Sequence, residues 1–434
     1  MADDATGKRI PLKIAESLVN SLNAGTTPRR GLEFITVGRV KEIKVLLGDL
    51  EQVRSGGSSC KFIIGEYGSG KSFMLQAIRN YALENDFVVM DVDLGPDKRF
   101  RGTGNKGLAT YRALMASMAT KTKPLGGALD SLLIKWLTRL QDEAGEMPAS
   151  AIQTQVARKV NDAVMQMENM MFAFDFAKVM TAYWDGVITD NDTRKYNAAR
   201  WFRGEYDGKR EAKAELGVGN IISDDTWYAF LRLWAEFVTG IGYSGLIVFF
   251  DEAKTLANIA SPAGRNANYE AILSIFNDTV QGRASHLAIF MGCTNQFVHD
   301  EKRGLFSYEA IRSRLDDGKF AERNGLRNWD APLMPLKVLS HEEIFALMQK
   351  LREIHGIRYT YTPRVTDQDL EELLQATVNR VGAATNLTAR EVTRNTMNIL
   401  GILYHNPDAK FSDIMNDNIA APAFEEDEDF LLDD

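Results

Sequence analysis

Cysteine is scarce in this chain, and long apolar runs are missing. The 434 residues include two cysteines, Cys60 and Cys293, which is too few for a disulfide framework and fits a reducing compartment. The longest apolar run that we find, residues 245–250, has the length of a strand and is too short to cross a bilayer. We find no signal-peptide pattern either, so we expect a cytoplasmic protein that does not contact membranes.

An excess of positive charge is also absent. Lysine and arginine number 51 against 59 acidic residues, a net charge of −8, which argues against a uniformly basic nucleic-acid-binding surface. Residues 424–434, FEEDEDFLLDD, contain seven of the acids, so the rest of the chain is nearly neutral and is compatible with a local basic groove. This acidic tail is either a solubilising segment or a docking peptide.

A glycine-rich stretch, GEYGSGKS at residues 65–72, is the strongest motif. It satisfies the phosphate-loop pattern G-x-x-x-x-G-K-[ST]. An apolar run precedes it and an amphipathic helical pattern follows, the order that directs backbone N–H groups and a helix N-terminus at one anion. We therefore expect ATP to bind here, with Lys71 on the phosphates and Ser72 on Mg²⁺. The predicted nucleotide-binding residues are Gly65, Glu66, Tyr67, Gly68, Ser69, Gly70, Lys71, Ser72 and Phe73.

An acid pair ends a second buried strand, in GLIVFFDEAKTL at residues 245–256. A carboxylate at the carboxyl end of a parallel strand beside a phosphate loop is placed to hold Mg²⁺. The next carboxylate is placed to activate water for attack on the γ-phosphate. We therefore predict Asp251 as the metal-side acid and Glu252 as the general base.

Two further candidate positions follow a third predicted core strand, residues 286–295. Thr294 or Asn295, at its polar end, is predicted to sense the γ-phosphate and the attacking water, although a plain strand-terminal turn gives the same pattern. Arg312 or Arg314 is placed to reach the nucleotide of a neighbouring subunit. Surface arginines on a helix are the alternative interpretation.

The turn Val37-Gly38-Arg39 precedes a predicted helix about 30 residues ahead of the phosphate loop. Such a turn commonly lies over the nucleotide base, so we include Val37, Gly38 and Arg39 among the nucleotide-binding candidates. Arg39 and Glu42 equally fit a surface ion pair.

A basic loop at residues 95–107 surrounds Phe100 with positive charges. This composition suits phosphate backbones and unstacked bases, and it also suits an ordinary polar loop. The candidate nucleic-acid contacts are Lys98, Arg99, Arg101 and Lys106.

The chain divides by pattern into an α/β core interrupted by a helical insertion and followed by a purely helical lid from Leu333. In the lid, Ser340 and Glu343 form a capping box, and Thr388 and Glu391 cap another helix. Arg390 and Arg394 lie one turn apart on one face of that helix, the pattern of a lid whose arginine reaches back toward the nucleotide. We expect an N-terminal extension (residues 1–30), the core with the phosphate loop (31–107) and the insertion (108–240). These are followed by the core with the acid pair (241–332), the lid (333–412) and the acidic tail (413–434).

In the order of these motifs the chain resembles AAA+ ATPases of the clade related to origin-recognition initiators and STAND NTPases. It is more closely similar to the ATP-binding proteins of BREX phage-defence systems, of the BrxD type, through VDLGPDKR, YRALM, WFRGE and TAREVTR. The resemblance implies a P-loop NTPase fold with a parallel central sheet, a homo-oligomer and defence-system partners. It also implies Asn295 or Thr294 as sensor 1, Arg312 or Arg314 as arginine finger and Arg390 as sensor 2.

These observations favour an ATPase that remodels or loads partners on DNA. A slow nucleotide-dependent switch that docks other proteins has the same motifs. A DNA-binding initiator is a third interpretation, and the lack of a winged-helix pattern after the lid counts against it.

Overall fold

The protein has two compact units in a computed structural model that describes residues 9–144, 158, 170–315, 328–381 and 388–418. The first unit contains the described residues of Met1–Leu46, Ile63–Asn80 and Met334–Asp429, and the second contains those of Leu47–Phe62 and Tyr81–Leu333. Each unit is therefore assembled from separate stretches of the chain. Among the helices that the structure describes, none combines the length and the apolar character of a membrane span.

A five-stranded sheet has the order β2-β3-β4-β1-β5. Its strands are β1 (Ser58–Ile64), β2 (Val88–Asp93), β3 (Leu246–Asp251), β4 (Leu287–Cys293) and β5 (Leu333–Pro335). The β2–β3 and β3–β4 pairs are parallel, with Leu246 opposite both Val88 and Leu287. All residues of β1 and β4 are buried, as is usual in a covered parallel sheet, although β1 includes the polar residues Ser58, Ser59 and Lys61. The parallel α/β core expected from the sequence is thereby confirmed.

Strand β5 corrects the expectation of a purely helical pattern from Leu333. In the first unit the Leu336 N–H donates to Ile64 O at 2.7 Å, and in the second the Phe62 N–H donates to Pro332 O at 2.8 Å. A three-residue strand is too short for hydrophobic periodicity to reveal it. The three residues form a strand because they pair with β1, and their own sequence does not predict it.

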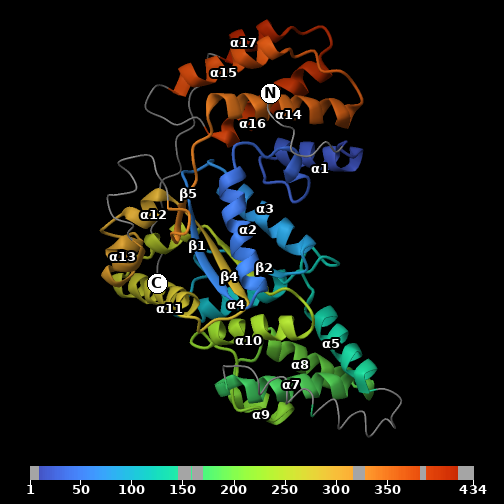
Figure 1. The fold of residues 1–434 in the computed structure, drawn as a ribbon, viewed down its shortest axis with the longest axis vertical. Coiled ribbons are helices and arrows are strands. Elements are labelled where there is room, and N and C mark those ends of the chain that lie inside the picture. The colour runs from blue at the N-terminus through green and yellow to red at the C-terminus, as the bar shows by residue number, and fades with distance from the viewer. Residues whose placement is uncertain (1–8, 145–157, 159–169, 316–327, 382–387, 419–434) are drawn as a thin grey trace. The chain divides into compact units, whose positions relative to one another are not determined.

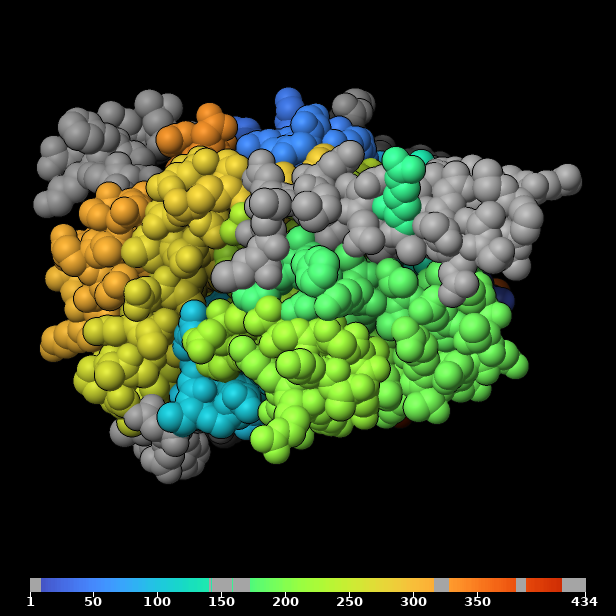
Figure 2. Space-filling model, turned by 90° about the horizontal axis from the view of Figure 1, so that it is seen from below, coloured from blue at the N-terminus to red at the C-terminus, as the bar shows by residue number. Residues whose placement is uncertain are grey.

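Helices replace strands between β2 and β3 in the described part of the chain, apart from isolated bridges. They are α4 (Lys106–Ser117), α5 (Leu129–Ala144), α7 (Met170–Ile188), α8 (Asp192–Phe202), α9 (Lys209–Leu216) and α10 (Trp227–Gly240). Helices α4 and α10 contact β2 and β3, while α7, α8 and α9 pack on one another (Figure 1). Figure 2 shows this bundle, in green, as one continuous surface.

Aromatic side chains form the core of this bundle. Phe176 lies 5.1 Å from Phe202 and 5.2 Å from Trp234 between ring centroids, and all three are buried. On α7, Phe172 and Phe176 are buried in this core, whereas Phe174 is exposed. One helix of the bundle therefore presents an aromatic ring to solvent.

A second helical core belongs to the first unit. It joins α1 (Leu12–Asn23) to α14 (His341–Tyr359), α15 (Asp367–Val381), α16 (Ala389–His405) and α17 (Phe411–Asn418). Leu18, Met348 and Leu400 are fully or almost fully buried in it. The predicted capping box is confirmed, because the Ser340 N–H donates to Glu343 Oε2 at 2.8 Å and the Glu343 N–H donates to Ser340 Oγ at 3.2 Å. Helix α17 crosses the boundary that we expect between the lid and the acidic tail, after residue 412.

Other helices flank the sheet strands in the chain. They are α2 (Val40–Arg54), α3 (Lys71–Glu84), α11 (Pro262–Val280), α12 (Asn295–His299) and α13 (Glu309–Leu315). Strand β1 leads into α3, and β4 leads into α12. These two strand-to-helix junctions contain the phosphate-loop motif and the two sensor candidates.

Candidate functional site

The phosphate-loop motif forms a turn between a strand and a helix. Strand β1 ends at Ile64 and α3 begins at Lys71. Gly68 and Gly70 have φ values of 75° and 97°, in the left-handed region that other residues rarely adopt. A loop of this conformation ahead of a helix N-terminus is the arrangement that binds phosphate groups.

Lys71 and Ser72 open helix α3. The Lys71 ammonium donates to Gly65 O at 2.7 Å and to Glu66 O at 2.8 Å, so it lies over the loop that phosphate groups would enter. Ser72 is exposed, and its hydroxyl is an oxygen ligand of the kind that Mg²⁺ takes. Both side chains stand where the pattern predicts them.

The other loop residues contribute in different ways. Glu66 and Tyr67 are exposed, Tyr67 by 62%. A Cβ at Gly65 would lie 2.3 Å from Ser69 Oγ, so a side chain at position 65 would collide with the loop. Phe73 packs against the helical core of the first unit. Its predicted role in nucleotide binding stays a prediction.

Helix α16 brings two residues against the loop. The Arg390 guanidinium donates to the Tyr67 hydroxyl at 2.6 Å, and the Arg390 backbone N–H donates to Gly68 O at 3.4 Å. A Cβ on Gly68 would lie 3.0 Å from Thr388. The predicted sensor arginine therefore lies at the phosphate loop, whereas Thr388 was predicted only as a helix cap, a role that its hydrogen bond with Glu391 confirms.

Arg39 is buried behind the loop, and this corrects the surface interpretation of its ion pair. It is 4% exposed and lies 3.5 Å from the Glu42 carboxylate, which is 3% exposed. The guanidinium also donates to Ser69 O at 2.9 Å and to Lys337 O. Arg39 therefore holds the backbone of the phosphate loop in place.

Val37 and Gly38 continue this support. Val37 packs partly buried against the helical core of the first unit. Gly38 has a φ of 63°, and a Cβ there would lie 2.5 Å from the Glu343 carboxyl carbon. The turn thus fits closely against the N-terminus of α14. Its predicted contact with the nucleotide base stays a prediction.

The acid pair stands at the end of β3 in the second unit. Asp251 Oδ1 accepts a hydrogen bond of 2.9 Å from the Glu252 N–H. Glu252 has φ 56° and ψ 32°, a left-handed conformation that is uncommon for a non-glycine residue. Thr255 fixes this turn, since its N–H and its hydroxyl both donate to Glu252 O, at 3.1 and 2.9 Å. The Glu252 side chain is 45% exposed, with Lys254 Nζ 4.0 Å away.

Asp93 is a neighbouring acid that the sequence analysis did not select. It ends β2 and pairs in register with Asp251 on β3. The carboxyl ends of the two strands therefore bring two aspartates to one sheet edge. The sequence signal was the DVD that ends the strand at residues 91–93, but acidic strand ends are too common for that signal to be decisive.

The end of β4 separates the two sensor candidates by their contacts. Thr294 caps α12, and its hydroxyl oxygen accepts from the Phe297 N–H at 3.1 Å. Asn295 is exposed as the first residue of that helix. The capping bond occupies Thr294, which favours Asn295 as the residue that meets a ligand.

The two finger candidates lie on α13. Arg312 is half-buried and forms an ion pair of 2.8 Å with Glu301. Arg314 is exposed and donates to Ala310 O at 2.7 Å. An arginine that reaches a neighbouring subunit must lie at the surface, and Arg314 fits that requirement better.

The basic loop is partly a structural element. Arg99 is 2% exposed and Phe100 is fully buried against Phe250, at a ring-centroid distance of 5.0 Å. Arg101 forms an ion pair with Asp225. The expectation of a nucleic-acid contact therefore does not hold for Arg99 in this conformation, because its side chain lies in the interior. Lys98 and Lys106 are partly exposed.

Both candidate metal ligands, Ser72 and Asp251, offer oxygen atoms to a metal ion. The described residues contain no group of three or more His, Cys, Asp or Glu that could enclose a metal ion. Mg²⁺ does not need such an enclosure, because it binds through one or two protein oxygens, phosphate oxygens and water. Ser72 and Asp251 fit that requirement by their chemistry.

Comparison with known proteins assigns the family. The family model described as BREX system ATP-binding protein BrxC/D matches residues 10–419. The search of curated proteins found no match to the chain. The family match spans the phosphate loop, the acid pair and helix α16. The chain therefore belongs to the BREX system ATP-binding protein family BrxC/D.

Proposed function

We propose that this protein binds and hydrolyses ATP with Mg²⁺ in a BREX-type phage-defence system and acts on DNA or on DNA-bound partners. Its family is one of ATP-binding proteins. The observation that carries the proposal is the loop with left-handed Gly68 and Gly70, over which Lys71 Nζ meets two loop carbonyls. That geometry suits a triphosphate, whose charge the ammonium and the loop amides neutralise.

The proposed phosphate and Mg²⁺ ligands follow from the chemistry of the residues. Lys71 and the loop amides bind the β- and γ-phosphates, and Ser72 and Asp251 would hold Mg²⁺ through oxygen. The ion, when bound, neutralises phosphate charge and orients the phosphates.

Glu252 is the proposed general base. The fixed turn at Thr255 and the bond to Asp251 Oδ1 hold its backbone in one conformation, so its carboxylate starts from a defined position. It accepts the proton of the water that attacks the γ-phosphate. Asn295 orients that water, Arg390 binds the phosphate from the loop side, and Arg314 or Arg312 reaches the nucleotide of a second copy.

A slow nucleotide-dependent switch is the second candidate. The bond between Arg390 and Tyr67 favours it, since it links α16 directly to the phosphate loop. Binding of a phosphate at the loop would change that contact and with it the position of α16. In this case assembly with partners, not turnover, is the output.

ATP turnover by wild type and Glu252→Gln, with and without duplex DNA, tests the proposal together with the mass in solution. We expect wild type to hydrolyse ATP faster with DNA. Glu252→Gln should lose about 100-fold or more in turnover and accumulate as a nucleotide-bound oligomer. The matched control is Glu270→Gln, which removes an exposed carboxylate from α11 and should keep wild-type turnover.

The outcomes separate the two candidates. ATP binding without turnover under every condition, with a change of mass, supports the switch and rejects the hydrolase. Equal turnover in wild type and Glu252→Gln rejects Glu252 as the base. If the rate of ATP hydrolysis is the same at every DNA concentration, the proposed action on DNA is rejected.

A further inference from the structure

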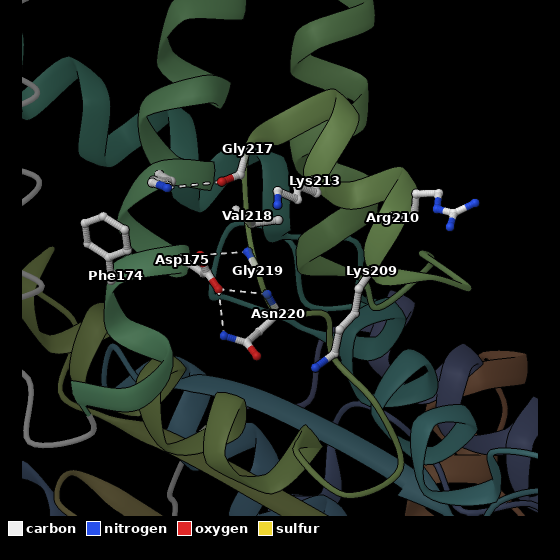
Figure 3. Close-up of a pocket in the computed structure, with 10 residues that line it drawn as sticks. Phe174, Asp175, Lys209, Arg210, Lys213, Gly217, Val218, Gly219 and Asn220 are labelled. Carbon is white, nitrogen blue, oxygen red and sulfur yellow. Dashed lines mark hydrogen bonds between the residues drawn. The ribbon is translucent and has the colours of Figure 1, made fainter.

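An open groove lies in the helical bundle of the second unit, between α7 and α9. Its volume is about 780 Å³, within the range of roughly 300–1,000 Å³ that is usual for ligand-binding pockets. The loop at residues 217–220 forms one wall (Figure 3). The charged or aromatic residues that line the groove are Phe174, Asp175, Lys178, Lys209, Arg210 and Lys213. None of the predicted ATP-site residues is among them.

Positive charge dominates the groove. Lys209, Arg210 and Lys213 are exposed. Within the described part of the chain, no acidic side chain lies within ion-pairing distance of these three. By contrast, Arg200 on the adjacent α8 pairs with Glu211 at 3.1 Å. The charges of α9 are therefore available to an anion from outside.

Two lysines of α9 share one face. Lys209 and Lys213 are four residues apart, which places them on the same side of a helix. Figure 3 shows Lys209 and Lys213 extending toward the loop wall, while Arg210 points away from Asp175. Two ammonium groups one turn apart suit successive phosphates better than a single anion.

Within the described residues the acid in the groove forms no ion pair with these lysines, and its oxygens accept hydrogen bonds from the loop. Asp175 is buried, and it accepts hydrogen bonds from the Gly219 N–H at 3.2 Å, the Asn220 N–H at 2.9 Å and the Asn220 side chain at 2.9 Å. Lys178 ties the same loop by donating to Gly217 O at 3.1 Å. The wall is thus fixed before any ligand arrives, which lowers the entropy cost of binding.

An exposed aromatic ring completes the groove. Phe174 is 58% exposed although its neighbours Phe172 and Phe176 on α7 are buried. Lys178 Nζ lies 4.5 Å from the centre of its ring. Exposed aromatic rings beside lysines are what nucleic-acid-binding proteins use to stack unpaired bases.

We infer that the α7–α9 groove binds single-stranded nucleic acid, with Lys209 and Lys213 on phosphates and Phe174 against a base. A duplex does not offer an unpaired base to the ring, and an acidic peptide matches the lysines but not the ring. The inference deepens the DNA part of the proposed function and rests on it. It does not depend on hydrolysis.

The test is binding of fluorescein-labelled oligodeoxythymidylate by the full chain, measured by polarisation across a salt series. We expect Lys209→Gln/Lys213→Gln to lose about tenfold or more in affinity. Its log–log salt slope should shrink by about 1.4, the value for two lost single-strand phosphate contacts. Phe174→Ala should lose affinity by about fivefold or more and leave the salt slope unchanged.

Arg194→Gln/Lys195→Gln is the matched control. It removes two charges from α8 in the same bundle, but both of these residues are already paired, with Asp185 and Asp192, so affinity should stay within about twofold of wild type. ATP turnover without DNA, measured on each variant, shows whether the fold is intact and reports on hydrolysis separately.

Each other outcome overturns a defined claim. If wild type does not bind the oligonucleotide or a duplex, the proposed action on DNA fails together with this inference. If wild type binds and the double lysine variant binds equally well, only the groove is rejected. Equal affinity for duplex and single-stranded DNA rejects the single strand as the ligand. It is also rejected if polyglutamate displaces the labelled oligonucleotide at a lower concentration than unlabelled oligonucleotide does.

Discussion

Arg390 donates a hydrogen bond of 2.6 Å to the hydroxyl of Tyr67, and its guanidinium carbon lies 5.0 Å from the centre of the Tyr67 ring. The two residues are 323 positions apart. Because Arg390 also donates its backbone N–H to Gly68 O, α16 forms part of the wall of the phosphate loop. A ligand that moves the loop therefore acts directly on the C-terminal helical core.

Arg390→Ala should lower ATP turnover by about tenfold or more, because the charge that we propose to stabilise the γ-phosphate is lost. Tyr67→Phe should have a smaller effect, since it keeps the ring and removes only the hydroxyl. Turnover and nucleotide affinity measured for both variants check this. Lys350→Ala is the control, as it removes one positive charge from α14 in the same unit. Wild-type turnover in Arg390→Ala would remove this residue from the site.

Arg39→Ala should destabilise the fold by about 3 kcal/mol, because it leaves the buried Glu42 carboxylate without its partner. It also frees the carbonyl of Ser69 in the phosphate loop, so nucleotide affinity should fall. The double variant Arg39→Ala/Glu42→Ala removes the unpaired charge and should recover part of the stability. Thermal unfolding, with and without ATP, measures both effects.

The exposed pair of Arg54 and Glu51 is the matched control for that prediction. It spans 2.7 Å and three residues of the same helix, α2. Exposed pairs contribute little, so Glu51→Ala should change the unfolding free energy by less than about 1 kcal/mol. Equal losses at the two sites would show that burial of the Arg39–Glu42 pair has no energetic consequence.

The sequence predicts the local features well because their causes are local. The glycine pattern of residues 65–72 and the capping at Ser340 and Thr388 depend on neighbours within a few residues. The burial of Arg99 depends on contacts with distant segments, and so does the placement of Arg390 at the loop. Strand β5 likewise exists through its pairing. These relations have no periodic signal in the chain.

The two sensor candidates show the same limit. Thr294 and Asn295 are adjacent, and both are polar residues of a strand end, so the sequence leaves them equivalent. The structure separates them because the hydroxyl of Thr294 caps α12. A helix cap can be recognised in a sequence only when the helix itself can be recognised. Helix α12 has five residues and is too short to show the hydrophobic periodicity of a helix.

Glu252→Gly should abolish turnover and leave the fold as stable as wild type or more stable by up to about 1 kcal/mol. The φ of 56° at Glu252 is costly for a side chain and free of strain for glycine. Loss of the carboxylate removes the proposed base. Chemical denaturation and turnover assays on the same samples measure the two effects. A marked loss of stability would show that the left-handed conformation is not strained.

Asp49 is predicted to make the stability of the second unit depend on pH. Burial raises its pKa from 3.8 to about 6, although Lys61 partly opposes the shift. The folded protein therefore holds the Asp49 proton more tightly than the unfolded chain does. The resulting stabilisation is complete below pH 3.8 and is lost as the pH rises through about 6. At pH 8 the ionised carboxylate costs roughly 1–3 kcal/mol.

Asp49→Asn keeps the shape of the side chain and removes its charge. We expect it to be more stable than wild type at pH 8, with the difference shrinking as the pH falls toward 4, because protonated aspartic acid and asparagine are both neutral. Unfolding free energies measured in urea across this range give the difference directly. Asp97→Asn, in an exposed turn, is the control and should follow wild type at every pH. A variant less stable than wild type at pH 8 would mean that the ionised Asp49 stabilises Lys61 more than burial penalises it.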